Sequence, residues 1–477
     1  MHELYQKIDR WIDDHRDEII GDICRIVSIR SISTPGEGGY PFGTGCKKVL
    51  DEMLALGAER GFKTHNYEDY CGALWMEEPE GRESIGFWGH LDVVPEGSDW
   101  MADPYKPYIK DGYLIGRGTG DNKGPTIGML HLIRCFNELG LKLNHALKLF
   151  VGCDEERAME DLEYYTAHYE CPEMNIIADS GFPVCYGEKG ILEGDVVTPA
   201  FTSGLLKAMK GGVASNVVPD RAEATLAKTE AVPAWAAALP EEYKVEMGED
   251  TVTVRAFGIS RHSARPEGGV NAIGKLTRIL MESGLFAGEE QQALTYLTAV
   301  NDDTCGTALG VVYEDEISGA LTCVGSRIRM TEEGELRLGI NIRYSITAKA
   351  AELIASMEEK SIAGGCSFDL ERDNASHYFP KEHPVVGRLT DIYNRETGME
   401  TAPYVMGGGT YARKLPRAFA YGPGGLPTPP VPEGLFAPGH GGAHAPDEGL
   451  YIENIFAAMK LYAKAIIEID DLKLAAE

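Results

Sequence analysis

ESIGFWGHLDVVP, residues 83–95, is the stretch from which the fold of this chain can be inferred. The apolar run at residues 85–88 predicts a buried strand, because an uninterrupted apolar run suits a strand that is covered on both faces. His90 and Asp92 follow at its carboxyl end, and two residues of separation put both side chains on one side. A metal-binding imidazole needs an acceptor at its second nitrogen, and Asp92 is placed for that role. A single His-x-Asp remains weak evidence until other segments complete a site.

Strand-like and helix-like segments alternate around this stretch. Apolar residues at helical spacing predict helices over residues 5–28, 46–60, 125–139, 161–168, 384–397 and 448–467. Apolar runs at residues 145–153, 174–179 and 417–422 predict further strands. This alternation predicts an α/β fold with a mostly parallel central sheet flanked by helices. Functional groups are then expected beyond the carboxyl ends of its strands.

The middle of the chain has a different pattern. Residues 243–260 and 334–347 are β-rich, and helical spacing recurs at residues 272–282 and 350–359. We therefore expect a discontinuous domain, residues 1–184 and 379–477, interrupted by an inserted α+β domain at residues 185–378. The insert is long enough for two subdomains.

Composition excludes several classes of protein. With 74 acidic and 45 basic residues the net charge is −29, and no basic stretch offsets it, so a nucleic-acid partner is not expected. The N-terminus has no signal-peptide pattern, and no apolar stretch reaches the length of a membrane span. The ten cysteines are scattered singly, which suits thiols in a reducing compartment. A soluble cytoplasmic protein without a membrane partner is expected.

Four later segments add a carboxylate or a histidine at a strand end or in a Gly-rich loop. They are Asp121 in GRGTGDNKG, Glu155 and Glu156 in CDEE, Asp179 in MNIIADS, and His440 and His444 in HGGAHAPDE. Each has a simpler interpretation: Asp121 or its neighbour could cap a helix, and acidic residues could belong to a solvated loop. Clustered carboxylates at the functional edge of a sheet are costly unless cations share them, so together these segments predict a metal centre. Spacing does not settle whether Glu155 or Glu156 is the ligand.

In this order and at these separations, the motifs resemble the M20 family of two-metal peptidases. The large insert and the segments GEKG, SNVVPD, GISRHSARPEGGVNA and GGTYAR resemble the PepV-like dipeptidases within that family. The resemblance covers essentially the whole chain. It implies that the discontinuous domain is catalytic and that the insert is a lid.

The resemblance implies a role for each residue of the centre. Asp121 bridges two divalent cations; His90 and Asp179 complete one site, and Glu156 and His444 complete the other. Glu155 is implied as the general base that activates a water shared by the cations, and Asp92 as the residue that orients His90. His440 is expected to be a loop residue. Zinc is the expected metal, with manganese or cobalt as alternatives.

The insert is implied to contact a short peptide. His262 matches a histidine that stabilises the oxyanion, Asn216 a second contact, and Arg343 an arginine that grips the C-terminal carboxylate. Backbone donors near Gly409 could serve the same carboxylate. Without the resemblance, His262 and Arg343 would be interpreted as surface charges.

The expected activity is hydrolysis of dipeptides or short peptides. Two alternatives stay open: an amidohydrolase of the same fold that acts on N-acyl amino acids, such as a deacylase or desuccinylase, and a non-catalytic protein that binds metal or peptide. A monomer is expected, with a dimer as the alternative. Two departures from the family pattern, Asn122 and Ser345, leave the implied ligands intact but put the substrate range in doubt.

Overall fold

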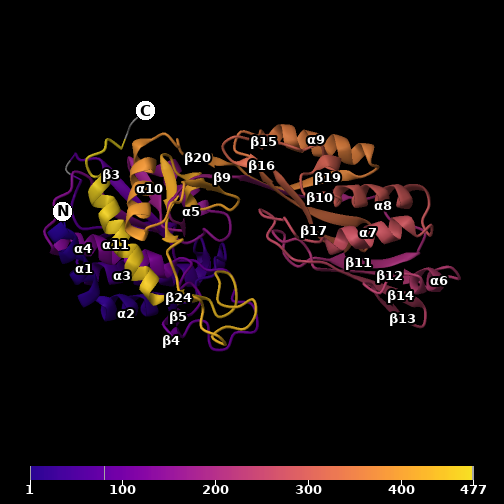
Figure 1. Ribbon diagram of the computed structural model, residues 1–477, viewed down its shortest axis with the longest axis horizontal. Helices are drawn as coiled ribbons and strands as arrows, with labels where there is room; N and C mark the ends of the chain where they lie inside the picture. The colour runs from indigo at the N-terminus through magenta and orange to yellow at the C-terminus, as the bar shows by residue number, and fades with distance from the viewer. Residues whose placement is uncertain (1, 80, 475–477) are drawn as a thin grey trace. The chain divides into compact units, whose positions relative to one another are not determined.

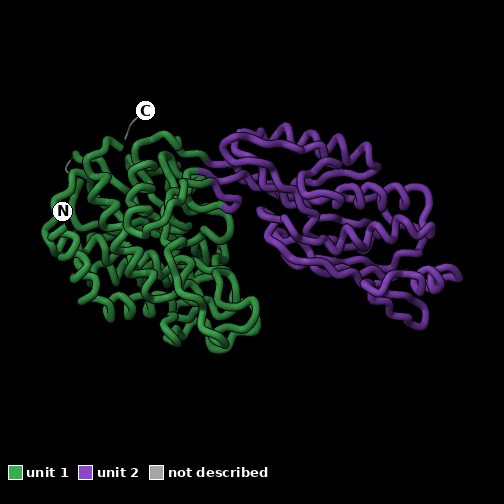
Figure 2. Tube along the Cα trace, in the orientation of Figure 1, with its two compact units in different colours: residues 1–186, 378–404, 409–477 green, residues 187–377, 405–408 purple. Residues whose placement is uncertain are grey.

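The computed structural model describes residues 2–79 and 81–474 as two compact units. The first unit comprises Met1–Tyr186, Tyr378–Tyr404 and Gly409–Glu477, and the second comprises Gly187–His377 and Val405–Gly408 (Figure 2). The short segment Val405–Gly408 was not expected in the second unit. It belongs to the second unit because β21 (Tyr404–Met406) pairs with β9 (Val184–Glu188). The chain passes from the first unit to the second within β9.

The first unit is built on a mixed sheet. In spatial order its strands are β1 (Lys63–Tyr67), β2 (Cys71–Trp75), β6 (Ala146–Gly152), β3 (Ser84–His90), β7 (Met174–Ile177), β22 (Ala418–Tyr421), β9 and β20 (His377–Tyr378). The central strands β6, β3, β7 and β22 are parallel, whereas β1, β2 and β9 join in antiparallel fashion. The expected parallel arrangement therefore holds at the centre of the sheet, where the strands are buried on both faces.

Helices cover this sheet (Figure 1). They are α1 (His2–Asp14), α2 (Arg16–Val27), α3 (Gly43–Glu59), α4 (Lys123–Glu138), α5 (Glu160–His168), α10 (Pro384–Thr397) and α11 (Ile452–Ile469). Helix α4 packs on β3 and β6 and also contacts α1, α2 and α11, while α3 packs on β1 and β2. The α/β class expected from the sequence is confirmed.

Two helices of the first unit differ most from their expected bounds. The helix expected over residues 5–28 is broken at His15, whose ring stacks on Trp11 and whose Nδ1 lies 2.7 Å from the Trp11 carbonyl oxygen. The last helix begins at Ile452 rather than at residue 448, because β24 (Gly449–Tyr451) pairs instead with β5 (Tyr113–Ile115), which in turn pairs with β4 (Tyr108–Lys110). A local contact of His15 marks the first difference, whereas strand pairing with a distant segment overrides local helical spacing at the second.

The second unit contains an antiparallel eight-stranded sheet. In spatial order its strands are β13 (Lys244–Met247), β14 (Thr251–Phe257), β12 (Arg221–Ala227), β11 (Leu206–Gly211), β17 (Thr322–Met330), β18 (Leu336–Tyr344), β10 (Gly190–Val197) and β19 (Ser367–Asn374). Helix α7 (Ala272–Glu282) packs on β12, β14 and β17, and α9 (Ala350–Ala363) packs on β19 and β10. Burial alternates along β12 and β14, so one face of the sheet meets the helices.

The remaining elements are helix α8 and several shorter helices, turns and strands. They are α6 (Val232–Ala237), α8 (Gly288–Val300), the 3-10 turns η1 (Glu37–Gly39), η2 (Thr307–Leu309) and η3 (Tyr411–Lys414), and the two-residue strands β8 (Ser180–Gly181), β15 (Glu314–Asp315), β16 (Gly319–Ala320) and β23 (Pro423–Gly424). Helix α8 packs on α7 and was not expected from the sequence. In the described part of the chain, no helix has the length and apolar character needed to cross a bilayer.

The register of the parallel strands determines what meets at their carboxyl ends. His90 on β3 pairs with Gly152 on β6, and Trp88 pairs with Ile177 on β7. The segments that follow these three strands therefore leave the sheet at the same edge. They carry Asp92, the CDEE sequence and Asp179.

Candidate metal centre

His90 is the most deeply buried part of the centre. Its side chain is 1% exposed, and its Nδ1 lies 3.0 Å from the backbone carbonyl oxygen of Asp92. A carbonyl oxygen can only accept, so Nδ1 donates and Nε2 is the nitrogen left for a ligand. This Nε2 lies 3.0 Å from Asp121 Oδ1 and 3.6 Å from Asp179 Oδ2.

The carboxylate of Asp121 lies between two imidazoles. Its Oδ1 faces His90, and its Oδ2 lies 3.1 Å from Nε2 of His444. His444 comes from a loop 323 residues further along the chain (444 − 121), and it adopts a left-handed backbone with φ of 62°. One carboxylate that offers a separate oxygen to each of two histidines is the arrangement that a bridging ligand requires.

Glu156 completes the His444 side. Its Oε1 and Oε2 both lie 3.1 Å from His444 Nε2. His440, the other histidine of this loop, instead contacts Asp447 at 2.6 Å. The structure therefore brings His444, and not His440, to the carboxylates of Asp121 and Glu156.

Asp179 and Glu155 lie on the His90 side. One oxygen or nitrogen each of His90, Glu155 and Asp179 lie within 4.8 Å of one another, and the same holds for His90, Asp121 and Glu156. These residue groups fit a metal site. Because Glu155 stands in one of them, geometry alone does not separate the two glutamates into ligand and base.

Crowded carboxylates shift the pKa values of the centre. Burial lowers the pKa of His90, but hydrogen bonds to Asp121 and Asp179 outweigh it and raise this pKa well above its ordinary value. A hydrogen bond to the same Asp121 carboxylate, with one to the neighbouring glutamate, raises the pKa of His444 to about 11. Burial and the negative charge of Asp179 raise the pKa of Glu155 well above its usual range. Such a cluster attracts positive charge, which divalent cations supply.

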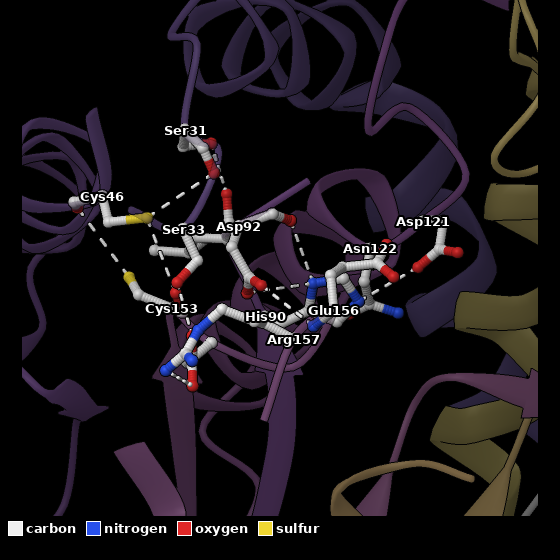
Figure 3. A network of polar contacts seen from close by, with 12 residues as sticks. Ser31, Ser33, Cys46, His90, Asp92, Asp121, Asn122, Cys153, Glu156 and Arg157 are labelled. Atoms are coloured by element: carbon white, nitrogen blue, oxygen red, sulfur yellow. Dashed lines mark hydrogen bonds and ion pairs between the residues drawn. The ribbon is translucent and has the colours of Figure 1, made fainter. Parts of the chain in front are cut away.

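Asp92 contacts the centre in two ways (Figure 3). Its Oδ2 accepts the backbone N–H of Glu156 at 3.0 Å, and its Oδ1 lies 3.4 Å from His90 Nδ1. The sequence led us to expect the carboxylate itself at His90 Nδ1, whereas the nearer acceptor is the Asp92 carbonyl. The fully buried carboxylate thus links the His90 strand to the CDEE turn.

Glu448 holds the loop that carries Asp121. Its carboxylate is 2% exposed; Oε2 accepts Arg117 Nη1 at 2.8 Å and the Gly118 N–H at 2.9 Å. Oε1 accepts the N–H groups of Gly120 at 2.9 Å and Asp121 at 3.0 Å. His444 and Glu448 belong to one short segment, so this segment fixes both the side chain and the backbone of Asp121.

Asn122 holds Asp179. Its Nδ2 donates to Asp179 Oδ1 at 3.0 Å and to the Ala178 carbonyl at 2.7 Å, and its Oδ1 accepts from Thr126 Oγ1 at 2.9 Å. An aspartate has no donor for the first two contacts unless it is protonated. The departure noted in the sequence therefore has a structural role in this chain.

A second buried carboxylate supports the CDEE turn. Asp161 Oδ2 accepts the N–H groups of Cys153 at 2.7 Å and Asp154 at 3.0 Å and the hydroxyl of Tyr411. Burial raises the pKa of Asp161 to about 7. Tyr411 belongs to the GGGTYAR segment and follows Gly409 by two residues. Through this tyrosine the segment supports the CDEE turn of the first unit.

The residues expected to contact a peptide lie mainly in the second unit. Asn216 and His262 are on adjoining loops: Ser263 N donates to the Asn216 carbonyl at 2.8 Å, and Val217 bridges to His262. Arg343 on β18 donates Nε to Asn341 Oδ1 at 3.0 Å and Nη1 to the Gly407 carbonyl at 3.0 Å. Burial, with the charge of Arg343, lowers the pKa of His262. Their role toward a substrate stays a prediction, as does that of Gly409 in the first unit.

Comparison with known proteins identifies the family. The model of "Peptidase family M20/M25/M40" matches residues 86–468. The chain belongs to this peptidase family. It is 31% identical, over 95% of its length and 97% of the relative's, to a putative dipeptidase, YtjP, of Bacillus subtilis (strain 168). It is 26% identical, over 95% and 96%, to a Beta-Ala-Xaa dipeptidase of Lactobacillus delbrueckii subsp. lactis.

Solved structures show the same fold. The human carnosine dipeptidase 1 structure superposes with a TM-score of 0.57, covering 98% of this chain and 99% of that one at 14% identity. At that identity the likeness concerns the fold alone. The M20 resemblance drawn from the motifs is thus confirmed by two independent comparisons.

Sequence reasoning did not single out Glu448, Arg117, Asp161 or Tyr411 in this M20 chain. Glu448 had a usable signal, because it follows Asp447 in the motif that supplies His444. Asp161 and Tyr411 had none, since their pairing joins positions 250 residues apart.

Proposed function

We propose that this protein is a metal-dependent dipeptidase. The observation that carries the proposal is Asp121, whose two carboxylate oxygens face His90 and His444 separately, in a chain of a peptidase family. Relatives across nearly the full length are named as dipeptidases, which favours short peptides over proteins.

The donor set favours two divalent cations. Asp121 would bridge them, with His90 and Asp179 on one side and Glu156 and His444 on the other. Two imidazoles and three carboxylates without a thiolate suit zinc, manganese or cobalt, and we take zinc as the first expectation. Cys153, the nearest cysteine in sequence, is buried and points its thiol toward the Cys46 carbonyl at 3.8 Å.

Bound cations would polarise the scissile carbonyl and lower the pKa of the attacking water. Glu155 then acts as the base: it accepts the proton that this water loses and donates it to the nitrogen of the departing amine. Protons balance, since one leaves the water and one reaches the amine.

The second unit is proposed to serve as the lid. His262 would face the oxyanion, Arg343 and Asn216 would hold the peptide and its free carboxylate, and backbone donors near Gly409 would add to this grip. A large insert can supply within one chain what smaller relatives take from a partner, so we expect a monomer, which light scattering after size-exclusion chromatography measures. We also expect the protein in the cytoplasm.

The test combines metal analysis with a substrate panel. The purified protein should contain about two divalent ions per chain, and it should hydrolyse dipeptides when these are compared with N-acetyl and N-succinyl amino acids. Hydrolysis of the acyl amino acids alone would show that the protein is a deacylase and not a dipeptidase. Two bound ions without hydrolysis of either class would indicate a binding protein.

A further inference from the structure

A cavity opens beside the proposed metal centre within the first unit. Its volume is about 250 Å³, and both Asp121 and Asp179 line it. Its other walls include Ser180 on β8, Gly424 on β23 and Leu450 on β24. A group held in this cavity would therefore lie next to the reacting bond.

The volume fits part of a dipeptide. Cavities that enclose a whole small ligand measure about 300–1,000 Å³. A space below that range suits one residue of the substrate.

The lining selects the kind of residue. Pro423, Ala443, Leu450 and Ile455 give the wall aliphatic surface, and Asn454 adds an uncharged amide. Among the described residues that line the cavity, none is basic. A carboxylate would find no basic side chain in this lining, whose charged members, Asp121 and Asp179, are acidic and are proposed to be engaged with the cations. The free carboxylate of the substrate and an acidic side chain are both disfavoured, whereas an aliphatic side chain gains by burial.

We propose that this cavity holds the uncharged side chain of the N-terminal residue of the dipeptide, with aliphatic residues preferred over acidic ones. The inference rests on the proposed dipeptidase function and adds its substrate class. The C-terminal residue, which carries the free carboxylate, is left to the arginine and loop donors of the lid.

Asn454 is the position from which the cavity can be altered. It is only partly buried on α11, and its Nδ2 donates to Thr428 Oγ1 at 2.7 Å. Ala457, one turn further along α11, is exposed and does not line the cavity. The two positions form a matched pair on one helix.

The first measurement is kcat/KM of the wild-type enzyme on Gly-Ala, Leu-Ala and Asp-Ala. Leu-Ala should exceed Asp-Ala by about tenfold or more, because the cavity offers the acidic side chain aliphatic walls and no basic partner. Equal rates on Leu-Ala and Asp-Ala would overturn the inference. Hydrolysis of none of the three would instead sink the proposed function itself.

The second measurement introduces a cation. Asn454→Lys should raise the ratio of kcat/KM for Asp-Ala over Leu-Ala about tenfold or more, whereas Ala457→Lys, with the same change of charge, should leave it unchanged. Metal content is measured in both variants, so that a disturbed centre is recognised. An equal shift in both would show a general charge effect and contradict the cavity assignment.

A third variant tests size without charge. Asn454→Phe narrows the cavity and should lower kcat/KM for Leu-Ala at least about tenfold relative to Gly-Ala. Ala457→Phe is its control. If the Leu-Ala to Gly-Ala ratio stays constant in Asn454→Phe while metal content is intact, the side chain lies elsewhere and the inference is wrong.

Discussion

The two histidines of the proposed centre are held very differently. His90 ends a central strand and is 1% exposed, whereas His444 lies in a loop and is 54% exposed. On the His90 side, Asn122 donates to the carboxylate of Asp179. On the His444 side, Glu448 accepts backbone N–H groups of the loop that carries Asp121. A buried strand end and a surface loop thus converge on one carboxylate. The comparison predicts two cation sites of unequal strength that share Asp121.

The largest effect is expected from removing what the two sides share. Asp121→Ala should abolish binding of both ions and lower kcat/KM by about 10³-fold or more, since the cations contribute several kcal/mol and each 1.36 kcal/mol is tenfold. Metal analysis after dialysis measures the first and a dipeptide assay the second. A variant that keeps one ion would show that Asp121 is not the bridge.

Next comes the contrast between the two histidines. Titration of the metal-stripped protein should show a tighter and a weaker step; His444→Ala should remove the weaker step, and His90→Ala the tighter one. The reason is burial, because a preformed and dry site spends less on ordering its ligands and screens its charges less. The opposite assignment of steps would mean that exposure does not govern affinity here.

The support of the loop side is tested with Glu448→Gln. This change keeps the size of the side chain but replaces one acceptor with a donor that faces N–H groups. Affinity for the weaker ion should fall about 10- to 100-fold, as when partners of metal ligands are changed. Glu453→Gln, an exposed glutamate of α11, is the control and should have no effect. Equal metal affinity in both variants would remove Glu448 from the account.

The smallest effect is expected on the buried side. Asn122→Ala removes two donors, to Asp179 and to the Ala178 carbonyl, but leaves Asp179 Oδ2 facing His90. The tighter ion should then bind about tenfold more weakly, the low end of such effects. Thr126→Val removes only the contact to the Asn122 oxygen and should change affinity less. If both variants bind as the wild type does, Asn122 serves the fold alone.

Features that depend on local spacing could be predicted from the sequence, whereas contacts between distant segments could not. The α/β class and the order of the central elements followed from apolar periodicity, because each strand or helix is decided largely by local spacing. The meeting of His90, the CDEE turn and Asp179 followed from parallel strands ending at one edge. His444 was preferred to His440 only through the family motif, and its contact with Asp121 depends on a loop whose path no periodicity encodes.

Other features could not be predicted because they depend on distant backbone. The Glu448 carboxylate accepts N–H groups of a loop more than 320 residues away. The residue types of that loop do not indicate which of its backbone N–H groups need an acceptor. The strand at Gly449–Tyr451 was read as helix because its pairing partner, Tyr113–Ile115, lies far along the chain. The segment Val405–Gly408 joined the second unit for the same reason.

The metal content of Glu155→Gln separates the roles proposed for Glu155 and Glu156. Geometry places Glu155 within reach of His90 and Asp179, so a ligand and a base would look alike in position. If Glu155 is the base, the variant should keep two ions per chain and lose about 10²- to 10⁴-fold in kcat. Retention of a single ion, or of full activity with both ions, would contradict the account.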